Sequence, residues 1–218
     1  MKTVSFTDGR PRIPVGKILC LGQNYAAHAK EMKAETPTVP VVFLKPSTAL
    51  LESGGTVRLP VMSRDVHHEV EMVIVIGKTG SRIAAHHAMD FVAGYAVGLD
   101  MTMRDVQADA KKRGHPWAVA KGFDTSAPLS PAVPKDEIAD PHNLDLSLRV
   151  NGSIRQSSNT GKMIFRVPDI IAYLSSVFTL EEGDLIFTGT PEGVGPVGPG
   201  DTLEATLQSV GSLKVKVD

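Results

Sequence analysis

The chain has 218 residues, of which 42% are hydrophobic, and this is enough for one sizeable core. Its formal net charge of −1 gives no electrostatic reason to expect nucleic acid or an anionic membrane surface as partner. No apolar run approaches the roughly 18 residues that span a bilayer, and the N-terminus lacks a secretory pattern. The single cysteine, Cys20, can form no internal disulfide and suits a buried position. We therefore expect one domain over residues 1–218, without a membrane segment, in the cytoplasm.

Short β-like runs separated by Gly and Pro follow one another along the chain, whereas segments with helical periodicity are few. The runs predict strands at 17–21, 41–44, 69–77, 91–100, 144–150, 185–188, 201–207 and 213–217. Helical patterns occur at 24–32, 102–113 and 167–178, the last with an apolar stripe typical of a core helix. The Asn151-Gly152 pair predicts a tight hairpin, and residues 124–141 read as a long surface connection. The expected fold class is α+β and predominantly β.

Two carboxylates, Glu69 and Glu71, open a predicted strand whose later residues are apolar on both faces. Because strand side chains alternate, both project to one face with Cα atoms roughly 7 Å apart. A third acid, Asp100, ends the next covered strand at a strand-to-helix corner. A buried carboxylate is usually protonated, paired with a base or bound to a metal. Three such groups without a cysteine partner suit Mg²⁺ or Mn²⁺.

An ion-pair network explains the same spacing equally well. Either glutamate could pair with Arg104, Lys111 or Lys121, and Asp100 could cap the helix that follows it. His67 shares the glutamate face and, as a ligand, would favour zinc or iron, although such a histidine more often packs beside a site.

His28 and Glu31 lie three residues apart on a predicted helix for which Asn24 is a candidate N-cap. A carboxylate beside an imidazole orients the ring and raises its basicity, so this pair could activate a water molecule. A solvated surface pair is the simpler explanation when the segment is considered alone.

Lys121 stands in an apolar segment and needs a partner if it is desolvated. An enolate or oxyanion would provide one, and a lysine stem packed beside Trp117 with an exposed amine is the alternative. Residues 188–195 follow a strand and offer a hydroxyl and backbone amides to a carboxylate. They lack the lysine and spacing of a phosphate-binding loop, and a structural glycine-rich turn is the alternative.

Several motifs in fixed order resemble the fumarylacetoacetate hydrolase family over nearly the whole chain. They are Leu21-Gly22-Gln23-Asn24-Tyr25-x-x-His28-x-x-Glu31, Phe43-Leu44-Lys45-Pro46-Ser47, His67-His68-Glu69-x-Glu71, Asp100-x-x-x-Arg104-Asp105-x-Gln107, Lys121-Gly122-Phe123-Asp124 and Thr188-Gly189-Thr190-Pro191-x-Gly193-Val194-Gly195. The short length, together with the Phe-Leu-Lys-Pro-Ser-Thr and Arg-Asp-Val-Gln matches, indicates the acylpyruvase branch. That branch hydrolyses acylpyruvates and in some members decarboxylates or tautomerises oxaloacetate.

The resemblance implies a mixed β-sandwich roll, a homodimer and a role for each matched residue. The Mg²⁺ or Mn²⁺ ligands would be Glu69, Glu71 and Asp100, and the water-activating dyad His28 and Glu31. Lys121 would stabilise an enolate or oxyanion. Gln107 and Thr190 would hold the substrate's carboxylate or keto oxygens, supported by Arg104 and Lys45. Many relatives carry arginine where this chain has Gln23, a difference that bears on which 2-oxo acid binds.

The implied activity is metal-dependent hydrolysis of the C–C bond of 3-acylpyruvates of the acetylpyruvate or fumarylpyruvate type, with oxaloacetate as a further substrate. Two alternatives remain open. One is an isomerase, hydratase or decarboxylase acting on a dioxo acid of aromatic degradation. The other is a non-catalytic protein that binds a 2-oxo acid through the same metal, which would have no use for a water-activating dyad.

Overall fold

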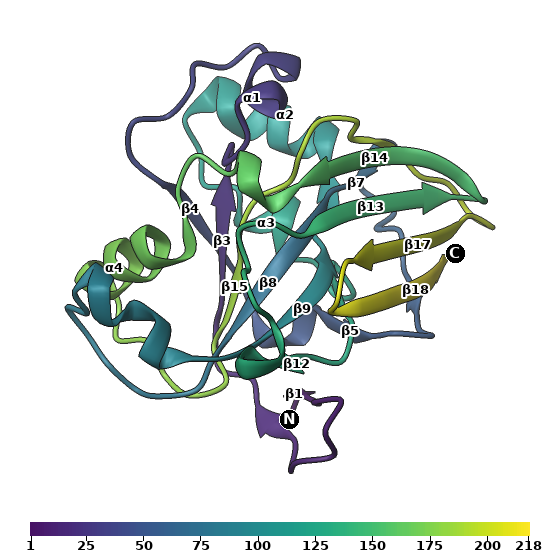
Figure 1. Ribbon diagram of the computed structural model, residues 1–218. Coiled ribbons are helices and arrows are strands. Elements are labelled where there is room, and N and C mark those ends of the chain that lie inside the picture. Colours follow the sequence, from purple (N-terminus) through teal and green to yellow (C-terminus); the bar gives the residue numbers. More distant parts are fainter.

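A mixed sheet forms the centre of the computed structural model, which describes all 218 residues (Figure 1). Its strands are β3 (Ile18–Gly22), β4 (Val41–Lys45), β5 (Leu50–Glu52), β8 (Val70–Ile76), β9 (Val92–Leu99), β11 (Ala127–Leu129), β12 (Val133–Pro134) and β15 (Leu185–Phe187). Neighbours follow the order β4-β3-β15-β8-β9-β11-β5, with β12 paired to β9. β15 runs parallel to β3 and β11 to β5, whereas β8 and β9 are antiparallel. All residues of β8 are buried, as expected of a strand covered on both faces.

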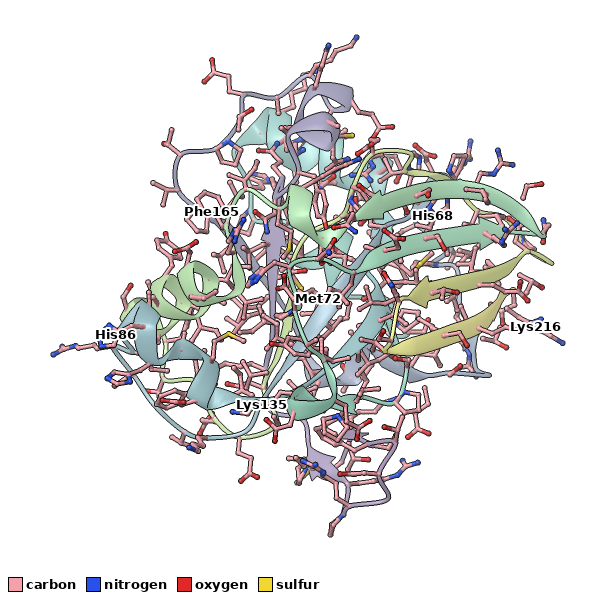
Figure 2. The ribbon with its side chains drawn as sticks, viewed as in Figure 1. His68, Met72, His86, Lys135, Phe165 and Lys216 are labelled. Atoms are coloured by element: carbon pink, nitrogen blue, oxygen red, sulfur yellow. The ribbon has the colours of Figure 1, made fainter.

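A second sheet packs across the first around β8 and β9 (Figure 1). Its strands are β6 (Thr56–Val57), β13 (Asp145–Val150), β14 (Ser153–Asn159), β17 (Thr202–Leu207) and β18 (Gly211–Val217), in the order β14-β13-β17-β18-β6. Burial alternates along β17 and β18, so one face points inward. Leu203 and Leu207 share a core cluster with Val97 and with Met72, which Figure 2 shows near the centre of the molecule.

The remaining strands are short. β1 (Thr3–Val4) pairs with β2 (Ile13–Pro14), and β7 (Val66–His68) lies between β10 (Thr102–Met103) and β16 (Gly195–Pro196). The helices are α1 (Ala26–Glu31), α2 (Arg104–Arg113), α3 (Ala118–Lys121) and α4 (Val167–Val177), with 3₁₀ turns η1 (Ser47–Ala49), η2 (Ala85–Phe91), η3 (Lys135–Glu137) and η4 (Thr160–Lys162). None of the helices combines the length and the apolar character that crossing a bilayer requires.

The predicted α+β, predominantly β fold is confirmed, and every predicted strand and helix has a counterpart with slightly shifted ends. Helix α4 buries Ile170, Ile171 and Leu174 and packs beside η2, as its apolar stripe predicts. The predicted hairpin joins β13 to β14, with positive φ of 50° at Asn151 and 80° at Gly152.

The strand predicted at 69–77 begins one residue later, at Val70, because Glu69 links β7 to β8. Two local predictions were wrong. The segment 124–141 is not a surface loop, since β11 and β12 bring much of it into the central sheet. Asn24 does not cap α1, whose N-cap is Tyr25. The Asn24 amide instead donates to the carbonyls of Phe165 and Thr188 and fastens two distant segments to the start of that helix.

Candidate metal centre and substrate pocket

Three carboxylates lie close together where strand β8 begins and strand β9 ends. In this antiparallel pair Val70 lies opposite Leu99, and the backbone N–H of Asp100 donates to the carbonyl of Glu69 at 2.8 Å. The register therefore brings Asp100 to the glutamates, and Glu69, Glu71 and Asp100 offer oxygens that all lie within 4.8 Å of one another. All three side chains are buried. The acids that the sequence singles out thus form one cluster.

Cations surround two of the three acids. Lys121 Nζ lies 2.8 Å from Glu69 Oε2 and 2.6 Å from Asp100 Oδ2. Arg104 makes a further ion pair with Glu69, and Lys45 Nζ lies 2.7 Å from Asp100 Oδ1. Both arrangements that the spacing allowed, a carboxylate cluster and an ion-pair network, therefore occur together.

Glu71 differs from its two neighbours because no lysine or arginine pairs with it. Its Oε2 accepts a hydrogen bond of 2.7 Å from the backbone N–H of Gly189. Burial, reinforced by the charges of Asp100 and Glu69, raises the pKa of Glu71 well above its usual value. Burial also acts to raise the pKa of Glu69, but the charges of Lys121 and Arg104 outweigh it and lower that pKa. For Lys121, burial is outweighed by Asp100 and Glu69, so its pKa is raised.

The donor set fits a hard divalent cation. Three carboxylates converge in a buried position, and oxygen ligands are those that Mg²⁺ and Mn²⁺ prefer. The unpaired Glu71 gains most from a cation, because its charge is the one that the protein itself leaves uncompensated. His67 is not in this group: its Nε2 lies 2.9 Å from Asp65 Oδ1.

The His28–Glu31 pair lies on α1 beside this cluster. His28 is only 5% exposed, and its Nδ1 lies 3.1 Å from Glu31 Oε2. The other oxygen of Glu31 accepts a 3.0 Å hydrogen bond from the N–H of Gly193. An ionised Glu31 makes Nδ1 the protonated nitrogen, which leaves the Nε2 lone pair free to act as a base. The pair is therefore built into the fold and is not the solvated surface pair considered above.

One pocket is lined by His28 of the dyad and by part of the charged cluster, whereas Glu31, Glu71 and Asp100 are not in its wall. Its wall includes His28, Glu69, Arg104, Gln107, Lys121 and Thr190. Arg104 donates to the Oε1 of Gln107 at 2.7 Å, which leaves the amide NH₂ of Gln107 for another acceptor. The hydroxyl of Thr190 donates to the carbonyl of Val70 at 2.9 Å, so holding a substrate carboxylate through this proton would require that hydrogen bond to change.

Lys45 does not line the pocket. Its ammonium is enclosed behind Asp100 and also donates to the carbonyls of Met101, Lys121 and Ser126. Lys121 is not the exposed amine packed on Trp117, because it is 2% exposed. Lys111 has that place instead, with Nζ 4.9 Å from the Trp117 ring centre.

Several pocket residues escaped the sequence reasoning as candidate substrate contacts. These are Lys111, Phe43 and Trp117, which line the wall. Gln23, which the sequence already linked to the choice of 2-oxo acid, also lines it and has a left-handed backbone with φ of 60°. Lys111, Arg104 and Lys121 give this wall a positive character suited to an anionic ligand. The residue types of Lys111, Phe43 and Trp117 are weak signals, because the chain has 23 lysines and arginines and an aromatic side chain packs in a core as readily as it lines a pocket.

Comparison with known proteins gives consistent results. The family model described as fumarylacetoacetate (FAA) hydrolase C-terminal matches residues 17–218. The chain is 52% identical to oxaloacetate tautomerase FAHD1, mitochondrial, of Bos taurus over 92% of this chain and 91% of that one. Its Arabidopsis thaliana namesake is 50% identical over 93% and 91% of the two chains.

Among solved structures, the fumarylpyruvate hydrolase from Pseudomonas aeruginosa in complex with Mn²⁺ and pyruvate superimposes with a TM-score of 0.95. The two chains are 39% identical, and the match covers 99% of this chain and 94% of that one. A fumarylacetoacetate hydrolase family protein from Yersinia pestis is 40% identical, with a TM-score of 0.94 and full coverage of both chains. This chain belongs to the fumarylacetoacetate hydrolase family.

Proposed function

We propose that this chain is a divalent-metal-dependent enzyme of small 2-oxo acids, and that its principal reaction is the keto–enol interconversion of oxaloacetate. One observation carries the proposal: one pocket is lined by Glu69 of the buried carboxylate cluster, by the buried ammonium of Lys121 and by the oriented imidazole of His28. The name of the bovine relative, 52% identical, supports oxaloacetate as substrate. The Mn²⁺ and pyruvate in the Pseudomonas aeruginosa structure support a metal-bound 2-oxo acid.

Glu69, Glu71 and Asp100 would hold the Mg²⁺ or Mn²⁺ ion. When bound, the ion would polarise the 2-oxo group and favour the enolate. The ammonium of Lys121 has three N–H donors, of which Glu69 and Asp100 take two. The third is available to an oxygen that becomes negative during enolisation, in a setting where water is largely excluded.

His28 is the candidate base for moving the substrate proton. Its Nε2 would take a proton from C3 of oxaloacetate, and Glu31 would stabilise the resulting imidazolium. Protonation of the enolate oxygen then gives the enol, and in the reverse direction the imidazolium of His28 returns its proton to C3 of the enolate to give the ketone. Gln107 and Arg104 would bind a carboxylate, and Lys111 adds positive charge to the same wall.

Hydrolysis of 3-acylpyruvates is the second candidate, and the His28–Glu31 dyad favours it. In this reaction His28 would deprotonate a water molecule, and the hydroxide would attack the distal carbonyl. The C–C bond then breaks and leaves pyruvate enolate, which Lys121 would hold until it is protonated. Both reactions thus pass through a 2-oxo acid enolate at the same position.

The test is a screen with Mg²⁺ and Mn²⁺ of oxaloacetate, acetylpyruvate and fumarylpyruvate. Enol absorbance and pyruvate release are followed, with protein-free metal as the control for uncatalysed enolisation. We expect faster oxaloacetate interconversion that exhaustive chelation abolishes. Tight oxalate binding without turnover of any compound would instead favour a binding protein.

Three further expectations belong to the proposal. A single catalytic domain is supported by the family match over residues 17–218. A homodimer and a cytoplasmic location remain predictions. Gel filtration with light scattering tests the first of these two, and cell fractionation tests the second.

A further inference from the structure

A buried amide from the second sheet reaches the pocket. Gln156 lies on β14 and is 1% exposed. Backbone groups fix the orientation of its side chain, because the N–H of Val70 donates to Oε1 at 3.1 Å and Nε2 donates to the carbonyl of Pro191 at 2.9 Å. Nε2 must therefore also donate to Thr190 Oγ1 at 2.8 Å, and Oε1 must accept from His68 Nδ1 at 3.0 Å.

All four hydrogen-bonding positions of the Gln156 amide are thus used. Figure 2 shows His68 close to the β13–β14 hairpin from which this amide extends. The same geometry fixes the Thr190 hydroxyl, which accepts from Gln156 and donates its own proton to the carbonyl of Val70. Thr190 lies on the pocket wall, so Gln156 determines which side of that hydroxyl faces a ligand.

The segment held by Gln156 also reaches the dyad. Two residues beyond Pro191, the N–H of Gly193 donates to Glu31 at 3.0 Å, and Glu31 contacts His28 Nδ1 through its other oxygen. Gly193 has a φ of +94°, and its α-carbon packs so closely on the carbonyl of Arg155 that a Cβ would collide with it. Residues 190–193 therefore lie between β14 on one side and α1 on the other.

We propose that Gln156 is a positioning residue for the reaction, acting through Thr190 and through the Gly193–Glu31 hydrogen bond. The inference rests on the proposed function for its kinetic part. Gln156 does not line the pocket. It acts on the pocket wall through Thr190 and on His28 through the segment 190–193, which contacts Glu31. The alternative is a purely structural role, in which the amide only satisfies the buried backbone groups of Val70 and Pro191.

The test compares Gln156→Met with a matched control, Gln208→Met, in the turn that follows β17 of the same sheet. Methionine has nearly the same length but cannot replace the hydrogen bonds. Gln208 is exposed, and its amide accepts only from the backbone of Asp145. In Gln156→Met we expect kcat for oxaloacetate interconversion to fall roughly ten- to hundredfold, because a small displacement of a catalytic group has effects of this size. The control should retain the wild-type kcat.

Hydrogen exchange at the Gly193 amide gives a readout that does not depend on turnover. Loss of one supporting hydrogen bond should accelerate exchange roughly tenfold in Gln156→Met and leave Gln208→Met unchanged. If Gln156→Met does not fold, Gln156→Glu replaces it, since this variant keeps an acceptor for Val70 and loses both donated hydrogen bonds.

A folded variant that melts earlier but retains both kcat and Gly193 protection would overturn the inference in favour of a structural role. A wild-type protein without any turnover would overturn the proposed function, while exchange at Gly193 would still decide whether Gln156 positions the segment.

Discussion

Glu69 and Glu71 belong to one carboxylate cluster, yet replacing each by glutamine should change the metal-free protein in opposite ways. Glu69 is paired with both Lys121 and Arg104, whereas Glu71 has a backbone amide and no cation. Glu69→Gln therefore leaves Lys121 with Asp100 alone and Arg104 facing a neutral amide. Glu71→Gln removes a buried charge that nothing compensates and retains an acceptor for Gly189.

The expected magnitudes follow from these contacts. Breaking a buried ion pair by removing one partner costs about 3–5 kcal/mol, so metal-free Glu69→Gln should lose this much unfolding free energy. At about 2–4 °C per kcal/mol for a chain of this size, the melting temperature falls by about 6–20 °C. Glu71→Gln should unfold within about 1 kcal/mol of the metal-free wild type or be more stable, since it breaks no ion pair and its amide oxygen still accepts from Gly189.

The metal separates the two effects. At a free concentration one hundred times its Kd, the ion stabilises the wild type by about 2.7 kcal/mol, or about 5–11 °C. Both variants lose one of three ligands and should lose most of this shift.

Thermal and denaturant unfolding with and without Mg²⁺ or Mn²⁺, after exhaustive chelation, measures both quantities. The reasoning is refuted if metal-free Glu71→Gln is destabilised as strongly as Glu69→Gln, or if either variant keeps the full metal-induced shift.

Three other outcomes follow from the same site. His28→Ala should abolish acylpyruvate hydrolysis while sparing much of any oxaloacetate decarboxylation, which needs no activated water. Pyruvate release from each substrate measures both activities. Equal losses of the two activities would contradict the role of His28 in activating water. Because burial and neighbouring acids raise the pKa of folded Glu71, the unfolded chain releases that proton first, near its ordinary value of 4.5. The unfolding free energy of the metal-free wild type, relative to that of Glu71→Gln, should therefore fall as pH rises from 4.5 to the folded pKa and then level off. Denaturant unfolding at a series of pH values measures this difference. An increase of the wild type's relative stability with pH would contradict the prediction. Burial raises the pKa of the Cys20 thiol well above 9.0, so iodoacetamide should label it only after unfolding, and rapid labelling of native protein would disagree with its enclosure.

Local patterns in the sequence were enough to predict most of the secondary structure. The apolar run of β8 and the stripe of α4 each reflect burial of one segment, and the Asn151-Gly152 turn depends on two adjacent residues. The surface loop expected at 124–141 failed for a different reason. β11 and β12 are short and contain Pro128 and Pro134. β11 is a strand because it lies between β5 and β9, and β12 because it pairs with β9.

The carboxylate cluster was predictable because strand alternation and a strand end already suggest where three acids point. Of the three bases named as possible partners of the glutamates, Arg104 and Lys121 do pair with Glu69 and Lys111 does not. The contact of Lys45 with Asp100 was not predicted. Lys45 is enclosed behind Asp100, whereas Arg104 and Lys121 reach the pocket. Residue type alone gives the charge of such a side chain but not the side of the cluster on which it lies.

Gln156 shows where sequence reasoning ends. It is a buried residue on a strand that is otherwise largely exposed, since Ser153, Ile154 and Arg155 before it are all exposed in the structure. Its partners are 86 residues away at Val70 and 34 at Thr190, and no spacing rule connects them. A buried amide with four partners is nevertheless an arrangement that tolerates few replacements, because each lost hydrogen bond leaves a polar group without water. The site thus depends on two sheets: the ends of β8 and β9 in the first position the acids, and β14 in the second holds the segment that joins Thr190 to Glu31.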